Sequence, residues 1–238
     1  MVFICVDVEA YERNTKLITE IGIATLDTKD ITSIVPGEGG ANWMSVIRAR
    51  HFRINEHKHL NNVDFVAGCA DRFEFGWVVV KASQEEIYWY NHSASEFINL
   101  KDTPHIIASC FKHPFSKNDE TASSHEEQPK RNIILVGHDI GADISFLQTV
   151  GYDVHNLSNL LETADTTFMW RYLKRESNPR SLGSILAELG IIGWNLHNAG
   201  NDAVYTLQAM IAIAIKHIDE KNKVKEVREQ EKKARISE

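Results

Sequence analysis

Acidic side chains occur at three separate places in this chain, each beside an apolar run. Asp7 and Glu9 stand two residues apart at the end of a strand-like run, so their carboxylates would point to the same face of a strand. Asp143 follows a run that ends in glycine, and Asp202 follows His197 by five residues just before another apolar run. Taken singly, each is explained by a solvated strand end or an Asp-capped helix start.

Taken together, these residues are the types that metal-assisted phosphodiester hydrolysis requires. Two neighbouring carboxylates are costly unless a cation neutralises them. A two-metal site needs about four carboxylates to hold two hard cations roughly 4 Å apart, together with a general base for the water. Asp7, Glu9, Asp143 and Asp202 would supply the carboxylates, and His197 would supply the base.

Three motifs in this order carry a family resemblance. They are Asp-x-Glu beginning at Asp7, Gly-His-x-x-x-x-Asp-x-x-Phe-Leu over 137–147, and His-x-x-x-x-Asp ending at Asp202. The succession resembles the DEDDh, or DnaQ-like, 3′→5′ exonucleases over residues 3–26 and 132–215. The resemblance implies an α/β fold of the RNase H-like kind, with a mixed sheet flanked by helices. It also implies 3′→5′ polarity and dependence on two Mg²⁺ or Mn²⁺ ions.

By motif position, the resemblance assigns the metal ligands to Asp7, Glu9, Asp143 and Asp202, and the activation of water to His197. Asp165 matches an Asp-Thr pair that follows the second motif in the family and is usually structural. Two positions depart from the family pattern. Asp139 stands where Asn is common, and residues 10–13 replace a Thr-Gly pair that contacts the 3′-terminal nucleotide. We therefore expect an intact metal-binding set with altered recognition of the substrate end.

Longer and weaker patterns resemble a fungal subgroup of this family. They lie at Ile18–Ala24, Arg50–Arg53 and Phe73–Gly76, and are similar to domains linked to a messenger-RNA export helicase and to an argonaute-interacting exonuclease of RNA silencing. The partners implied are RNA or DNA with a 3′ end, and a protein from the argonaute or RNA-export machinery. The alternative function is a catalytically silent DEDD-fold module that binds RNA or protein. Its usual mark is a lost carboxylate, and none is lost here. An endonuclease or RNase H proper also uses carboxylates, but the third motif favours the exonuclease.

Composition limits the remaining possibilities. The chain has 238 residues, 43% hydrophobic and 25% charged, as is usual for a soluble globular protein. A net charge of −7 argues against binding nucleic acid through bulk positive charge, but not against a nuclease with catalytic carboxylates. Three scattered cysteines argue against disulfides and structural zinc. No apolar run reaches the roughly 18 residues of a membrane span, and no signal peptide is present. We expect no membrane association and an intracellular location, cytoplasmic or nuclear.

The hydrophobic pattern predicts one exonuclease domain over 1–215, with a disordered loop at 116–131, and a charged helical extension or tail over 216–238. Strands are predicted at 3–8, 17–26, 45–54 and 132–136, and helices at 143–150, 181–189 and 203–215, with a helix start at 103–104. Residues 73–80 and 87–90 are either short strands or packed aromatics.

Two features offer contacts for nucleic acid. The segment 48–59 is rich in arginine and histidine, and is either a nucleic-acid contact or an exposed edge strand protected by positive charge. Trp77, Tyr88, Trp89 and Tyr90 would either stack on bases or pack in the core.

Overall fold

The computed structural model describes residues 1–81, 87–91, 94–112, 115 and 130–236. Its centre is a mixed sheet of six strands in the order β6-β3-β2-β1-β7-β8. The strands are β1 (Val2–Tyr11), β2 (Asn14–Asp27), β3 (Arg48–Ile54), β6 (Glu96–Ile98), β7 (Ile133–Gly137) and β8 (Leu160–Asp165). The pairs β1–β2 and β2–β3 are antiparallel, whereas β1–β7, β7–β8 and β3–β6 are parallel. The predicted α/β class with a mixed sheet is confirmed.

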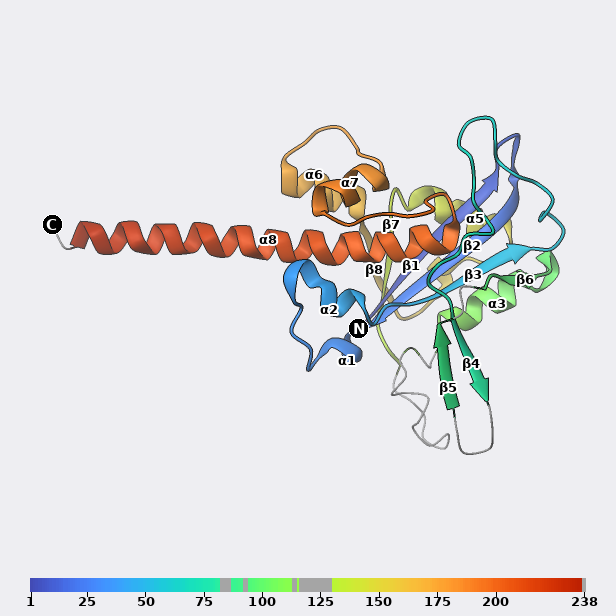
Figure 1. Cartoon of the computed structure of the whole chain (residues 1–238), viewed down its shortest axis with the longest axis horizontal. Coiled ribbons are helices and arrows are strands. Elements are labelled where there is room, and N and C mark those ends of the chain that lie inside the picture. The colour runs from blue at the N-terminus through green and yellow to red at the C-terminus, as the bar shows by residue number, and fades with distance from the viewer. Residues whose placement is uncertain (82–86, 92–93, 113–114, 116–129, 237–238) are drawn as a thin grey trace.

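Helices cover both faces of this sheet (Figure 1). They are α1 (Thr28–Ile31), α2 (Ala41–Met44), α3 (Thr103–Cys110), α5 (Gly141–Thr149), α6 (Thr166–Lys174), α7 (Leu182–Leu189) and α8 (Ala199–Ile236). One core contains Ile4, Val6 and side chains of α3 and α5, while Cys5 on the opposite face packs with α8. Side chains alternate along a strand, so Asp7 and Glu9 share the face of Cys5, which is the face that α8 covers.

A separate two-stranded ribbon pairs β4 (Trp77–Lys81) with β5 (Ile87–Asn91). Figure 1 shows it projecting from the side of the sheet where β3 and β6 lie. The side chains of the predicted aromatic cluster at 77 and 88–90 lie outside the described residues.

Two glycines let the start of α8 lie directly on the sheet. A Cβ on Gly22 of β2 would come within 1.8 Å of the Ala199 carbonyl oxygen. A Cβ on Gly200 would come within 2.6 Å of His51 and Phe73. Only hydrogen at these two positions permits the approach, and this close approach fixes the first turn of α8 against β2 and β3.

The second half of α8 leaves the body of the protein. Its first half is buried through residues such as Leu207 and Ile213, but Ile218, Val224 and Val227 are half exposed or more. Figure 1 shows this part as one helix running out to the C-terminal end. The helix predicted at 203–215 thus begins earlier, at Ala199, and continues through the charged segment to Ile236. Among the described residues, no helix combines the length and apolar character needed to cross a membrane.

Several sequence predictions of elements are wrong in their bounds. Residues 45–47 follow α2, and the strand begins only at Arg48. For residues 73–80, which the sequence left open as short strands or packed aromatics, both occur: Phe73 is buried against His51, with 5.2 Å between ring centroids, and β4 begins at Trp77. Of the predicted disordered loop, 116–129 lie outside the described residues. Arg131 is not solvated, because it forms an ion pair with the fully buried carboxylate of Asp27.

Candidate active site

The four predicted carboxylates converge at one place beside the sheet. Asp7 and Glu9 come from β1, while Asp143 and Asp202 lie in the first turns of α5 and α8, where the helix dipole favours negative charge. The backbone N–H of Val8 donates a hydrogen bond to Asp143 Oδ1 at 2.9 Å, which joins α5 to β1 between the two strand carboxylates. Burial, and then the charges of Asp143, Asp202 and Glu9, raises the pKa of Asp7 well above its usual range.

The pKa values of the other three carboxylates are also raised. Burial, and then the charges of Glu20 and Asp202, raises the pKa of Glu9 to about 8. Burial raises the pKa of Asp143 to about 7, and burial raises the pKa of Asp202 to about 7. Like charges in a partly dry site hold protons unless cations neutralise them. This electrostatic environment is suited to divalent metal ions.

The third motif places a histidine beside two of these carboxylates. The backbone N–H of His197 donates to Asp202 Oδ2 at 2.8 Å, and the His197 side chain is exposed. Ligand atoms of Glu9, His197 and Asp202 all lie within 4.8 Å of one another. Asp202 Oδ1 is buried, with no hydrogen-bond partner among the described residues. An unpaired buried carboxylate oxygen is costly, and a hard cation would satisfy it. The carboxylate donors therefore fit a divalent metal ion.

The loop that carries His197 is held in an uncommon backbone conformation. Asn195 and His197 have φ of 48° and 67°, in the left-handed region that non-glycine residues rarely occupy. The side-chain amide of Asn201 donates to the carbonyls of Asn195 and Arg72, at 3.0 and 2.9 Å. Cys69 N–H donates to the His197 carbonyl at 3.2 Å. The segment 69–72 therefore fixes the histidine from outside α8.

A fifth carboxylate, Glu20, was not predicted from the sequence. It lies opposite Glu9 in the β1–β2 pairing and is only 5% exposed. Its Oε2 accepts a hydrogen bond from His51 Nε2 at 2.9 Å, and His51 Nδ1 lies 2.8 Å from Ser95 Oγ. The available signal was a charged residue inside the apolar run 17–26, but one Glu on a strand more often faces water.

The departure at residues 10–13 has a structural explanation. The Glu12 carboxylate accepts hydrogen bonds from three consecutive backbone N–H groups, those of Val63, Asp64 and Phe65, at 3.0, 3.0 and 3.1 Å. The Asn62 side chain bridges the Glu12 N–H and the Ala10 carbonyl. Residues 61–66, the latched loop, are thereby fixed to the β1–β2 hairpin. The side chains of Val63 and Phe65 are 69% and 80% exposed.

The latched loop also closes one side of the site. Asn61 and Asn62 line a small polar cavity of about 20 Å³ together with Glu9, Glu20 and His197. Residues of the latched loop thus stand directly beside the carboxylates.

Asp165 has the structural role expected from the resemblance. Its carboxylate caps α6 through Thr167 N–H at 2.8 Å and also accepts the N–H groups of Asp139 and Ile140, at 3.2 and 3.1 Å. Asp139 has a φ of 62°, a conformation that Asp and Asn tolerate better than most residues. This explains how Asp replaces the common Asn without disturbing the turn into α5.

The basic segment at 48–59 does not form an exposed basic edge. Arg50 makes a bidentate ion pair with Glu96 of β6, at 2.8 and 2.7 Å, and His51 is fully buried. The Arg53 guanidinium lies over the Phe97 ring, 5.1 Å from its centroid. The edge-strand interpretation is wrong, since β6 pairs with β3 and lies outside it in the sheet. The nucleic-acid contact of this segment stays a prediction.

The chain is similar in sequence to one protein family and to several fungal proteins. A family model described as DNA polymerase III subunit epsilon-like, C-terminal domain (DEDDh_C) matches residues 2–87 and 78–213. The uncharacterized nucleolar protein C2C4.08 of Schizosaccharomyces pombe is 31% identical over 214 residues, covering 87% of this chain and 67% of that protein. Good for full DBP5 activity protein 2 of Saccharomyces cerevisiae is 30% identical over 225 residues, covering 85% of this chain but only 33% of that protein.

Solved structures resemble the chain more distantly. An exonuclease I structure gives a TM-score of 0.46 at 15% identity, covering 89% of this chain and 40% of that one. The nuclease domain of 3′hExo, a DEDDh family member bound to rAMP, gives a TM-score of 0.44 at 13% identity, covering 90% of each chain.

Proposed function

Because the chain belongs to the DEDDh exonuclease family, to which the family model assigns residues 2–87 and 78–213, we propose that it is a metal-dependent 3′→5′ exonuclease. The substrates proposed are RNA or single-stranded DNA with a free 3′ end. One observation carries the proposal: Asp7, Glu9, Asp143, Asp202 and His197, from three distant parts of the chain, meet at one site.

In this proposal, four carboxylates hold the metals. Asp7, Glu9, Asp143 and Asp202 would hold two Mg²⁺ or Mn²⁺ ions. When bound, the ions would neutralise charge on the scissile phosphodiester and lower the pKa of a water.

His197 would act as the general base. Its exposed ring would accept a proton from the attacking water, and its closeness to the Glu9 and Asp202 ligand atoms, within 4.8 Å, supports this role. The hydrogen bond from the backbone N–H of His197 to the Asp202 carboxylate would hold the base and the metal ligand next to each other. The latched loop would contact the terminal nucleotide in place of a Thr-Gly pair.

A nuclear site of action and a protein partner belong to the same proposal. The relative named as a nucleolar protein supports the nuclear site of action. The relative named for DBP5 activity supports the protein partner. The chain spans 67% and 33% of these two proteins, so the partner could contact segments beyond the shared region.

Oligonucleotide degradation tests the function. We would incubate the protein with 5′-labelled 20-nucleotide RNA and DNA in magnesium, in manganese and in chelator. The proposal expects a descending ladder in either metal and none in chelator or with Asp7→Asn. Metal-independent products would contradict it. Intact oligonucleotide that nevertheless binds tightly would favour a catalytically silent module.

A further inference from the structure

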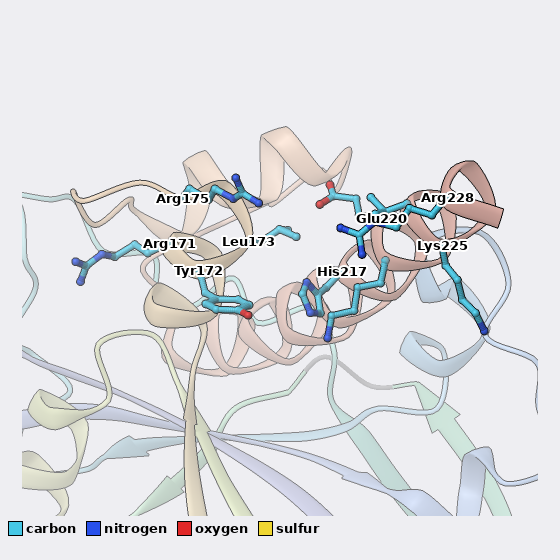
Figure 2. Close-up of a pocket in the computed structure, with 10 residues that line it drawn as sticks. Arg171, Tyr172, Leu173, Arg175, His217, Glu220, Lys225 and Arg228 are labelled. Atoms are coloured by element: carbon cyan, nitrogen blue, oxygen red, sulfur yellow. The ribbon is translucent and has the colours of Figure 1, made fainter. Parts of the chain in front are cut away.

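A groove of about 650 Å³ separates α6 from the exposed part of α8 (Figure 2). Its lining comes from the second half of α6 and from one face of α8 beyond His217. The lining residues are Arg171, Tyr172, Leu173, Arg175, His217, Glu220, Lys221, Val224, Lys225 and Arg228. Five arginines and lysines against one glutamate make this groove basic on a chain whose net charge is −7.

The α6 wall alternates aromatic rings with arginines. Phe168, Arg171 and Tyr172 follow each other at helical spacing and form one face of α6, and Arg175 caps the end of the helix in a left-handed conformation. Phe168 and Tyr172 are 63% and 73% exposed, whereas Trp170 of the same helix is fully buried in the core. The Arg171 guanidinium lies 5.7 Å from the Phe168 ring centroid. Exposed rings interleaved with arginines are the side chains that bind single-stranded nucleic acid.

The α8 wall of the groove carries three cations and one carboxylate, Glu220. Lys221, Lys225 and Arg228 line the groove at spacings of four and three residues. The acidic Asp219 and Glu226 of the same stretch are not part of the lining. The part of α8 that lines the groove therefore has a net positive charge.

The groove cations are not used in ion pairs within the described part of the chain. Lys174 and Arg180 near α6 pair with Glu188, at 2.7 and 2.8 Å. By contrast, Arg175, Lys221 and Arg228 make no ion pair with a described carboxylate. Their charges remain available to an anionic partner.

We propose that this groove binds the single-stranded nucleic acid upstream of the 3′ end that is being cut. The inference rests on the proposed exonuclease function and adds a second contact region to it. Asp202 lies in the first turn of α8, and His217 to Arg228 follow it by 15 to 26 residues. At a rise of 1.5 Å per residue, the groove lies roughly 22–39 Å from the site. At 3.4 Å per nucleotide or more, about a dozen nucleotides or fewer would span that distance.

Each wall would have its own role. Lys221, Lys225 and Arg228 would neutralise successive phosphates, and the Tyr172 ring would receive a base on its exposed side. The other side of Tyr172 is already supported by His217, with ring centroids 5.6 Å apart (Figure 2). This edge contact restricts the ring on one side, while Tyr172 remains 73% exposed and open to a stacking base.

Charge reversal on the two faces of α8 provides matched variants. Lys221→Glu with Arg228→Glu changes the groove, while Lys216→Glu with Lys223→Glu makes the same charge change at two positions outside the lining. The full chain would be titrated against a fluorescein-labelled 20-nucleotide single strand in chelator, at several salt concentrations. We expect the groove variant to raise Kd about tenfold or more. For this variant, the slope of log K against log salt concentration should become shallower by about 0.7 for each lost phosphate contact.

Cleavage assays separate this inference from the proposed function. A dinucleotide cannot reach the groove, so wild type and both variants should cleave it equally, while the KM for the 20-nucleotide strand should rise only in the groove variant. If wild type cleaves neither the dinucleotide nor the 20-nucleotide strand in the presence of metal, the exonuclease function itself is rejected. Equal Kd and salt dependence for both variants would overturn the groove inference. Binding of a polyglutamate peptide, but not of the oligonucleotide, through these lysines would overturn it in favour of an acidic protein partner.

Discussion

Individual residues have distinct tasks in the proposed site. Asp7 has the most crowded electrostatic environment, since Asp143, Asp202, Glu9 and Glu20 all raise its pKa after burial does. Under the proposed mechanism, a residue surrounded by carboxylates in this way is best placed to contact both metal ions. The exposed ring of His197 is better placed to exchange protons with solvent.

The roles of base and ligand can be separated by substitution. His197→Ala should lower the single-turnover rate by roughly 10²- to 10⁴-fold, the usual contribution of a general base. Manganese binding, followed by calorimetry, should persist. Asp7→Ala should weaken manganese binding and abolish cleavage, because an oxygen ligand is lost. If His197→Ala loses manganese as severely as Asp7→Ala does, the histidine is a ligand. A wild-type rate would remove it from the mechanism.

At the scale of elements, the site depends on how closely neighbouring segments approach. The first turn of α8 sits on β2, and the latched loop sits on the β1–β2 hairpin. Both contacts join segments that are distant in the chain. Each can be disturbed without touching a carboxylate of the site.

The contact between β2 and α8 requires a glycine. Gly22→Ala would place a methyl group 1.8 Å from the Ala199 carbonyl oxygen, so α8 must shift and carry Asp202 with it. We expect a loss of several kcal/mol in the free energy of unfolding, as for other overpacked sites, and a marked drop in cleavage. Gly141→Ala is the control, because its Cβ would have no neighbour within 4 Å. If the two variants have the same Tm, the close approach of β2 and α8 does not contribute to stability.

The latched loop should act on substrate binding. Glu12→Ala removes the acceptor for three N–H groups of residues 63–65, so the loop should loosen and the KM for oligonucleotides should rise about tenfold. The kcat should change little, since no carboxylate of the site is altered. Glu56→Ala removes a comparable bond, to Leu100 N–H at 2.9 Å, in another region. If both variants show the same KM as wild type, the loop does not contact the substrate end.

At the scale of the whole molecule, the sequence predicted the positions of the motif residues better than the structure around them. The motif residues were identifiable because metal chemistry fixes their types and spacing. Glu20 was missed because only strand pairing brings it opposite Glu9. The strands β6 and β8 were missed because edge strands are short or largely exposed and lack regular alternation. The latched loop depends on hydrogen bonds across about fifty residues, which no local pattern reveals.

The crowded carboxylates should also make the stability of the metal-free protein depend on pH. Between the ordinary pKa near 4 and the raised values of about 7 for Asp143 and Asp202 and about 8 for Glu9, the folded state holds protons that the unfolded chain has released. Stability is therefore greatest at the acidic end of this window and falls as pH rises through it. A loss on the order of 2 kcal/mol would lower Tm by about 4–8 °C between pH 5 and pH 8.

Thermal melts in chelator and in manganese would check this dependence. Manganese should raise Tm most at pH 8, where the carboxylates are free to bind it. The double variant Asp143→Asn with Asp202→Asn should flatten the dependence in chelator, because amides do not titrate. A wild-type Tm that is constant or rises from pH 5 to pH 8 in chelator would refute this account of the carboxylates.

The central claim is that four carboxylates hold two cations where a phosphodiester is cut. Its most direct test is an anomalous difference map from a crystal of the protein grown with manganese and a short oligonucleotide. The account predicts two manganese peaks about 4 Å apart. The peaks should be bounded by Asp7, Glu9, Asp143 and Asp202, with the 3′-terminal phosphodiester between them and His197 beside it. A map with no peak among these carboxylates, or with the oligonucleotide end bound elsewhere, would contradict the account.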